Sequence, residues 1–189
     1  EAALADETVQ GTELVFPPLN PRQVKGLSAD LGPMVALANP LDYHTYIWRD
    51  KAAMTQAWAA MADDEIAMTL LVSDYPRADL CDASDWECVT QAAIEATRRT
   101  GRPFAVVASL AELLPEQTAK TLMDHGVGAI HGLDHGLEAL DVMSRPMAPP
   151  AEPVLLPGID RDAELLDEQS AKLALAAHGL TIPPSVVVT

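Results

Sequence analysis

Three polar side chains capable of chemistry stand close together in the run Ala-Asn-Pro-Leu-Asp-Tyr-His-Thr-Tyr-Ile-Trp, residues 38–48. Asn39 and Asp42 can hydrogen-bond a ligand, and His44 can exchange a proton because imidazole titrates near neutral pH. Tyr43 and Tyr46 flank His44, which could also line a ligand pocket. Asparagine and aspartate equally often bond turn backbone, so a purely structural role stays open. Asn39, Asp42 and His44 are therefore the candidate catalytic residues.

Two further groups resemble metal sites only loosely. His131 and His135 are four residues apart, with His125 nearby, but Gly132 interrupts the helix that would aim both imidazoles at one ion. The second group consists of three aspartates at three-residue spacing: Asp79, Asp82 and Asp85. Their segment lacks the central glycine and the closing glutamate of a calcium loop. We expect no metal site, and we interpret the aspartates as solvated residues that cap a helix.

The overall charge limits the classes of partner. The formal net charge of −16 in 189 residues would repel nucleic-acid phosphates and anionic membranes, so neither is expected to bind. Cys81 and Cys88 fit no metal or redox spacing, which favours reduced thiols in the cytoplasm. No run of eighteen apolar residues and no export leader is present, so we expect neither a membrane span nor secretion.

Apolar runs typical of strands occupy residues 34–37, 66–73, 104–109 and 127–130, and each is followed by a stretch typical of a helix. Residues 1–10 are also expected to be helical. Asp50 should cap a helix that buries Met54, Ala57, Trp58 and Met61. Ser84 and Glu87 predict a capping box, before a buried stripe through Trp86, Val89, Ala93 and Thr97.

Two more helices follow. Pro115 and Glu116 should begin a helix with Leu122 inside, which Gly126 stops. Asp134 should precede a helix whose inner face runs through Leu137, Leu140 and Val142. Strands that alternate with helices pair in parallel, because each crossover returns the chain to the same edge. The sequence therefore predicts a three-layer α/β domain, with residues 39–44 in a loop at the carboxyl edge, where open sheets bind ligands.

A different composition begins at residue 146. Five prolines fall within residues 146–157, which predicts a stiff linker. Beyond it, Asp167 should cap a short helix that ends at Gly179. The apolar stripe of that helix contains Leu166, Leu173, Ala174 and Ala177. The final run Thr-Ile-Pro-Pro-Ser-Val-Val-Val predicts the start of a strand, so a second domain is expected to begin here.

Several segments resemble, in order, the acyl-CoA synthetases that form ADP, the relatives of succinyl-CoA synthetase. The run Asn-Pro-Leu-Asp at 39–42 is similar to that family's Asn-Pro-x-Asp loop, and the preceding Phe-Pro-Pro-Leu at 16–19 to its Leu-Pro-Pro-Leu turn. Thr-Gly-Arg-Pro at 100–103 resembles its Gly-Lys-Pro turn. The run 165–184 is similar to the opening of the family's ATP-grasp domain. Together these segments cover nearly the whole chain.

The resemblance implies a flavodoxin-like CoA-ligase domain over 1–145 without the family's first strand, a proline-rich linker over 146–160, and the truncated start of an ATP-grasp domain over 161–189. It implies an acid–CoA ligase that uses ATP, CoA and Mg²⁺ and acts through a phosphohistidine in another ligase domain. That histidine segment and the CoA-binding domain have no counterpart here. The fragment alone is therefore expected to be inactive and to hold no cofactor.

The implied partners are the CoA-binding domain, the phosphohistidine domain, the ATP-grasp domain and an organic acid, and a homodimer is left open. In this family the loop at 39–42 would face the phosphohistidine or the acyl site. Two alternatives remain. The same domains can regulate a protein acetyltransferase, or the chain can be a free-standing nucleotide- or flavin-binding module. Against the last alternative, no glycine-rich phosphate loop follows any of the expected strands.

Overall fold

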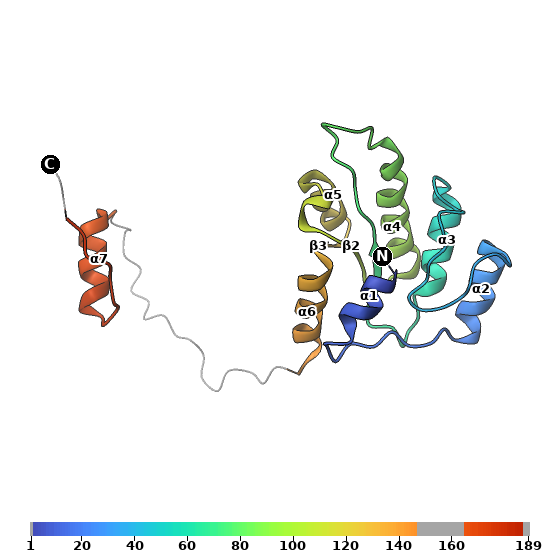
Figure 1. Ribbon diagram of the computed structural model, residues 1–189, viewed down its shortest axis with the longest axis horizontal. Helices are drawn as coiled ribbons and strands as arrows, with labels where there is room; N and C mark the ends of the chain where they lie inside the picture. Colours follow the sequence, from blue (N-terminus) through green and yellow to red (C-terminus); the bar gives the residue numbers. More distant parts are fainter. Residues whose placement is uncertain (1, 147–164, 187–189) are drawn as a thin grey trace. The chain divides into compact units, whose positions relative to one another are not determined.

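The computed structural model describes residues 2–146 and 165–186 (Figure 1). The chain divides into two units, residues 1–147 and 148–189, which are described separately. Apart from Pro146, the expected linker at 146–160 lies outside the described residues. The same holds for residues 161–164 of the expected second domain.

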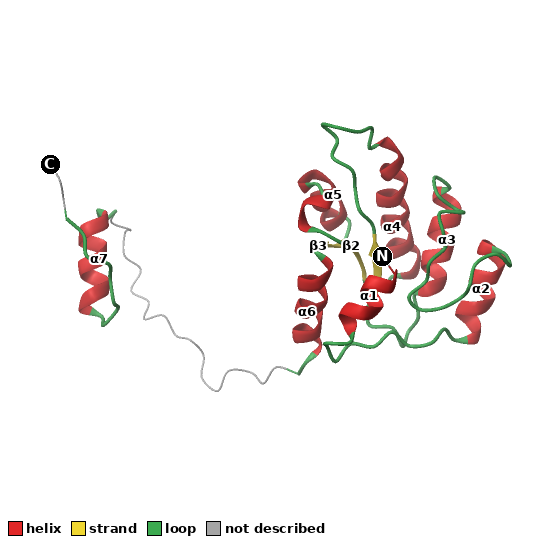
Figure 2. Cartoon of the chain, viewed as in Figure 1, coloured by secondary structure: helices red, strands yellow, loops and turns green. Residues whose placement is uncertain are grey.

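The first unit contains a three-stranded parallel sheet in the order β1-β2-β3 (Figure 2). Its strands are β1 (Thr69–Val72), β2 (Phe104–Ala108) and β3 (Gly128–His131). Thr69 lies opposite Phe104, and Ala105 lies opposite Gly128. The strands predicted at 66–73, 104–109 and 127–130 are confirmed, although β3 begins and ends one residue later than predicted, and their parallel pairing is confirmed as well.

Helices precede and follow each strand of this unit. The α-helices are α1 (Ala2–Val9), α2 (Pro21–Leu31), α3 (Lys51–Met61), α4 (Glu87–Thr100), α5 (Glu116–Asp124) and α6 (Leu133–Ser144). Two single turns of 3₁₀ helix, η1 (Ser84–Trp86) and η2 (Ala111–Leu113), precede α4 and α5. No helix in the described parts of the chain combines the length and the apolarity that a membrane crossing requires.

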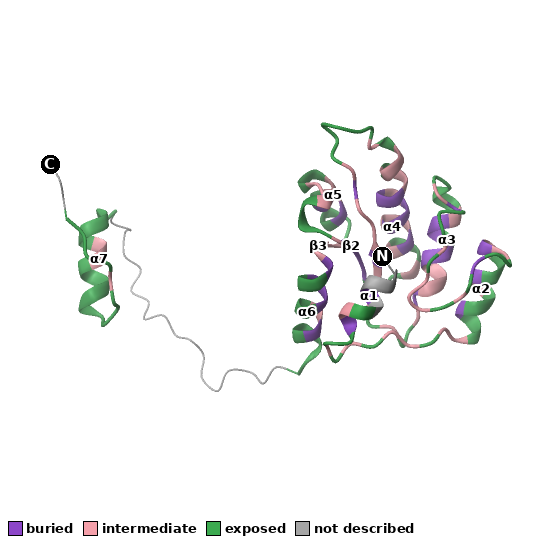
Figure 3. Ribbon diagram, in the orientation of Figure 1, coloured by how far each residue is buried: buried purple, intermediate pink, exposed green. Residues whose placement is uncertain are grey.

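Helices cover both faces of the sheet, as Figure 3 shows by the buried strips that they turn inward. On one face, Phe104 and Val106 belong to a large buried cluster with residues of α2, α3, α4 and α5. On the other face, Val107 packs with Ala5 of α1 and Leu137 of α6. Successive residues of β2 therefore point into different layers, which explains why the whole strand is buried. The α/β class with helices on both faces is confirmed.

Helix α3 forms where the sequence predicts it. The carboxylate of Asp50 accepts a hydrogen bond from the N–H of Ala53 at 2.9 Å, which caps the first turn. Met54, Ala57 and Trp58 are buried at three- and four-residue spacing and form the inner face.

The capping box predicted at the start of α4 is wrong. Ser84 lies in the 3₁₀ turn η1, the residue that caps α4 is Trp86, and no side chain bonds the cap. The carboxylate of Asp82 instead accepts the N–H of Ser84 at 2.9 Å. The 3₁₀ turn displaces the helix start by two residues, so the spacing that a capping box requires is lost. Val89 and Ala93 are nevertheless buried, as expected.

The inner face of α6 differs from the prediction. The helix begins at Leu133, so Asp134 lies inside it, and Val142 is 58% exposed. Leu133, Leu137 and Asp141 form the buried stripe at four-residue spacing. Asp141 can occupy this stripe because its carboxylate accepts the N–H of Glu13 at 2.8 Å and pairs with Arg145.

The strand predicted at 34–37 is also wrong, because this segment belongs to no strand. Val35 is buried and Leu37 is partly buried against the large core cluster. The apolar pattern therefore arises from a loop that packs on the core. Pro33 and Pro40 bracket the segment, and neither can donate a hydrogen bond to a neighbouring strand.

The described part of the second unit contains one helix, α7 (Glu168–Ala177). Asp167 caps it by accepting the N–H of Ser170 at 2.8 Å, as predicted. No residue of 165–186 is buried, so the expected apolar stripe is exposed within this unit. Residues 181–186 form no strand, and 187–189 lie outside the described residues.

Candidate functional site

Two polar residues meet where β1 and β2 end. The carboxylate of Asp74 accepts the N–H of Ser109 at 2.7 Å and the Ser109 hydroxyl at 2.6 Å. Asp74 follows β1 by two residues, and Ser109 directly follows β2. Because parallel strands end at the same edge, this pair marks the carboxyl edge of the sheet, where open α/β folds bind ligands.

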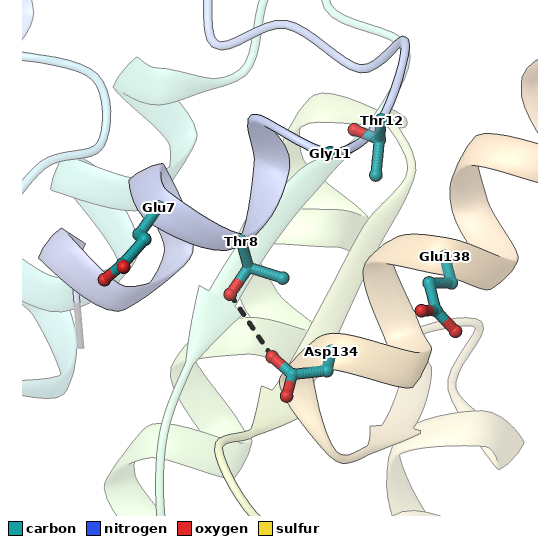
Figure 4. Close-up of a pocket in the computed structure, with 6 residues that line it drawn as sticks. All are labelled: Glu7, Thr8, Gly11, Thr12, Asp134 and Glu138. Carbon is teal, nitrogen blue, oxygen red and sulfur yellow. Dashed lines mark hydrogen bonds between the residues drawn. The ribbon is translucent and has the colours of Figure 1, made fainter.

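The end of β3 adds a second group of polar residues at this edge. Gly132, with a φ of 90°, turns the chain into α6, and the N–H of Leu133 donates to the carbonyl of Ser109 at 3.2 Å. The hydroxyl of Thr8 donates to Asp134 Oδ1 at 3.2 Å and joins α1 to the first turn of α6 (Figure 4). The Nδ1 of His131 lies 3.1 Å from the carbonyl of Ala111.

A hollow lies between the end of α1 and the start of α6 (Figure 4). Its lining residues are Glu7, Thr8, Gly11, Thr12, Asp134 and Glu138. Three carboxylates in this lining would repel the phosphates of ATP or CoA. Among the described residues no group of three or more His, Cys, Asp or Glu side chains could hold a metal ion that would offset this charge. The acidic lining of the hollow therefore disfavours anionic ligands.

Asn39 and Asp42 both bond backbone within this chain. The side-chain amide of Asn39 donates to the carbonyl of Pro17 at 3.0 Å, which ties it to the segment that enters α2. Asp42 Oδ1 accepts the N–H of His44 at 2.8 Å and lies 3.6 Å from the His44 Nδ1. Because 34–37 is not a strand, the expected position of this run directly after a strand is wrong. Asp42 has the turn-forming role left open from the sequence, whereas Asn39 bonds the backbone of a segment 22 residues earlier.

Asp42 and His44 nevertheless remain accessible, with side chains 59% and 57% exposed. His44, Thr45 and Arg49 all have positive φ angles, of 50°, 63° and 69°. Residues other than glycine rarely adopt this conformation, which costs about 1 kcal/mol or more at each position. The surrounding contacts must therefore hold the loop in this shape.

Contacts with the start of α4 hold the end of this loop. The rings of Trp48 and Trp86 meet edge to face, with their centroids 5.1 Å apart. Arg49 forms an ion pair with Asp85. Ile47 is buried and belongs to the large core cluster. Since α4 carries the chain from the end of β1 back to the start of β2, its first turn lies on the carboxyl side of the sheet. The later part of the loop is therefore on that side.

The structure does not connect the residues of the 39–44 run to the polar pair at the ends of β1 and β2. Within residues 2–146, no hydrogen bond or ion pair links Asn39, Asp42 or His44 to Asp74 or Ser109. Sequence reasoning missed Asp74 and Ser109. The available signal was their position at the end of a predicted strand, where polar residues gather at one edge.

The other histidines and aspartates singled out from the sequence each have their own local contacts. The Nδ1 of His125 lies 2.8 Å from the carbonyl of Thr121, and that of His135 lies 3.7 Å from Glu138. Asp79 pairs with Arg77, whose hydrogen bond lowers the pKa of that carboxyl. The backbone N–H of Ser84 likewise lowers the pKa of Asp82.

Comparison of the chain with protein-family models gives no match, and comparison with curated proteins gives no significant match. The fold and the geometry above are thus the observations that bear on function.

Proposed function

We propose that this chain is part of an ATP-dependent acid–CoA ligase that forms ADP, and that its sheet is the flavodoxin-like domain of that enzyme. The main support is the combination of a parallel sheet covered on both faces with the exposed turn Asp42–His44, which leads to the carboxyl side. That combination fits the fold and the loop that the sequence resemblance implies. The phosphohistidine would be held by another domain, and Asp42 and His44 would face it across a domain boundary.

Charge supports a shared site. The net charge of −16 and the acidic lining of the hollow beside Asp134 disfavour tight binding of ATP or CoA by this unit alone. Mg²⁺, ATP and CoA would therefore contact partner domains, including the ATP-grasp domain that would begin near residue 161. In this proposal the enzyme acts in the cytoplasm, and this unit supplies one wall of the active site and an assembly surface.

The test uses the polypeptide that carries this chain, incubated with ATP, Mg²⁺, CoA and a panel of organic acids. Acyl-CoA and ADP should form together, and acid-labile phosphate should appear on a histidine of the protein. Transfer of acetyl groups from acetyl-CoA to lysines, without ADP, would instead favour a regulatory role in an acetyltransferase. A bound flavin spectrum, with neither reaction, would favour a flavin module.

Substitutions at the turn sharpen this test. Asp42→Asn and His44→Gln should each lower acyl-CoA formation by about tenfold or more if these groups position or protonate the reacting centre. His135→Gln is the matched control, because its side chain is 89% exposed and its Nδ1 lies 3.7 Å from the carboxylate of Glu138. Equal rates for all three variants would remove Asp42 and His44 from the site and leave the ligase assignment to be decided by the unsubstituted protein.

A further inference from the structure

A second hollow, which we call the α3–α4 hollow, lies between two helices of the first unit. Helices α3 and α4 pack against each other and stand side by side in Figure 1. The hollow has a volume of about 480 Å³. Its lining residues are Lys51, Ala52, Thr55 and Gln56 of α3 and Glu95 and Arg99 of α4. Lys51, Gln56 and Arg99 are exposed, so the hollow opens to solvent.

Two cations of this lining, Lys51 and Arg99, form no ion pair. Neither side chain forms an ion pair or a hydrogen bond with any residue that the structure describes. Every other lysine or arginine within residues 2–146 and 165–186, except Lys25 on α2, is paired with a carboxylate. The chain has 28 acidic and only 12 basic residues, so carboxylates are plentiful. Two unpaired cations in one hollow therefore depart from the pattern of the rest of the molecule.

The one carboxylate in this lining, that of Glu95, is already neutralised. The Nε of Arg98 donates to Glu95 Oε2 at 3.0 Å, and its Nη2 donates to Oε1 at 2.7 Å, so both carboxylate oxygens are bonded. The hydrogen bonds from Arg98 lower the pKa of Glu95, and the charges of Lys51 and Arg99 lower it further. Both unpaired cations thus act on the same point, and the hollow keeps an excess of positive charge.

The lining also offers a neutral donor and room for a ligand. The side-chain amide of Gln56 is exposed and forms no hydrogen bond with a described residue, so both of its N–H groups can donate. The hydroxyl of Thr55 is already used, because it donates to the carbonyl of Lys51 at 2.8 Å. Ala52 has only a methyl group, which leaves space beside Lys51. An ammonium, a guanidinium and an amide together form a donor set that suits the oxygens of a phosphoryl group.

We propose that the α3–α4 hollow is a binding site for a phosphoryl group, with Lys51, Arg99 and Gln56 as its donors. A phosphoryl group fits better than a carboxylate, because it carries nearly two negative charges and three terminal oxygens for two cations and an amide. The net charge of −16 does not prevent this binding, since carboxylates more than about 8 Å away are largely screened at physiological ionic strength. The site uses neither Asp42 nor His44 and does not depend on the ligase proposal.

The probes are inorganic phosphate and methyl phosphate, each titrated into the isotope-labelled full chain at neutral pH while sodium chloride keeps the ionic strength constant. The NMR signals of the Gln56 side-chain amide and the Arg99 Nε–H should shift and saturate. The side-chain amide of Gln91, which donates to Glu87 at 2.9 Å, should not shift. Tighter binding of methyl phosphate would identify the natural ligand as a phosphate ester, and tighter binding of inorganic phosphate would identify it as the free ion. Saturation by a blocked Glu-Glu dipeptide, but by neither phosphate, would overturn the proposal.

Single substitutions separate this site from general charge effects. Lys51→Gln and Arg99→Gln should each weaken phosphate binding by about tenfold, because each removes a charged donor. Lys25→Gln is the matched control, since Lys25 is also exposed and unpaired within the described residues but lies outside the hollow. Glu95→Gln should tighten binding by about threefold or more, because it removes the carboxylate and frees Arg98. Shifts that grow linearly without saturating, or equal weakening by Lys25→Gln and Lys51→Gln, would overturn the proposal.

Discussion

Ser109 donates both its N–H and its hydroxyl to the carboxylate of Asp74, at 2.7 and 2.6 Å, and so joins the ends of two neighbouring strands. Asp74→Ala removes the acceptor and leaves the partly buried N–H of Ser109 unpaired. We expect this change to lower the free energy of unfolding by about 1–3 kcal/mol, measured by urea denaturation at neutral pH.

Two variants make that experiment specific. Asp74→Asn keeps one acceptor oxygen, so its free energy of unfolding should lie between those of the wild type and Asp74→Ala. Asp79→Ala removes an exposed carboxylate from a surface pair with Arg77 and should leave the denaturation midpoint almost unchanged. If Asp74→Ala behaved like Asp79→Ala, the bridge between the strand ends would contribute nothing measurable.

The contact between α6 and β3 depends on the absence of a side chain at Gly136. A Cβ atom at this position would lie 2.4 Å from the Cγ2 of Ile130, which is too close without a local shift. Gly136→Ala should therefore destabilise the fold by about 1–3 kcal/mol despite the higher helix propensity of alanine. The change in thermal midpoint, converted with the unfolding enthalpy, measures it.

Ile130→Ala should partly rescue Gly136→Ala, because it removes the clashing methyl group. A double-mutant cycle gives the coupling between the two positions. Gly11→Ala is the control, since a Cβ there would meet only the carbonyl oxygen of Thr8, at 3.9 Å. Additive effects of Gly136→Ala and Ile130→Ala would show that the two sites do not contact each other in solution.

Tyr75 makes stability sensitive to alkaline pH. Burial raises the pKa of its phenol from 10.0 to about 12, although the hydrogen bond with Thr90 lowers it. The folded state therefore favours the neutral phenol. Its contribution to the free energy of unfolding is complete below pH 10.0 and is lost as pH rises toward about 12. Unfolding titrations should show a loss of up to about 1.4 kcal/mol per pH unit in this window.

Tyr75→Phe should remove that alkaline dependence while costing about 1 kcal/mol at pH 7, because the hydroxyl lies 3.0 Å from the Thr90 hydroxyl. Tyr46→Phe is the control, since Tyr46 is 61% exposed. If the free energies of unfolding of wild type and Tyr75→Phe fell equally with pH above pH 10, Tyr75 would not be the source of the alkaline dependence.

The sequence allowed the sheet to be predicted because each of its strands is an unbroken apolar run between helix signals. β2, Phe-Ala-Val-Val-Ala, is buried along its whole length, as a central strand covered on both faces must be. The same apolar signal failed at 34–37, where Val35 is buried by loop packing. Burial alone does not specify hydrogen-bond partners, and the prolines at 33 and 40 were the signal against a strand.

The candidate site was less predictable, because it depends on contacts between distant residues. Ser109 and Asp74 are 35 residues apart, and Thr8 and Asp134 are 126 apart. Residue type and local spacing directed attention to His44, whose immediate neighbours are polar and aromatic. No local pattern predicts that Trp48 would contact Trp86, or that Asp85 would pair with Arg49.

Asp63 should make the junction of α2 and α3 sensitive to acid. Hydrogen bonds from the Asn20 side chain, from Arg22 and from the backbone of Glu65 lower the pKa of its carboxyl from 3.8 to about 2. The folded state thus favours the ionised carboxylate. Its contribution to the free energy of unfolding is complete above pH 3.8 and is lost as pH falls toward about 2. Asp63→Asn should therefore be less stable than wild type at pH 7, and the difference should shrink between pH 4 and 2. Asp64→Asn is the neighbouring control, because the side chain of Asp64 is 97% exposed. If the loss of stability caused by Asp63→Asn stayed constant down to pH 2, the ionised carboxylate of Asp63 would have no role in stability.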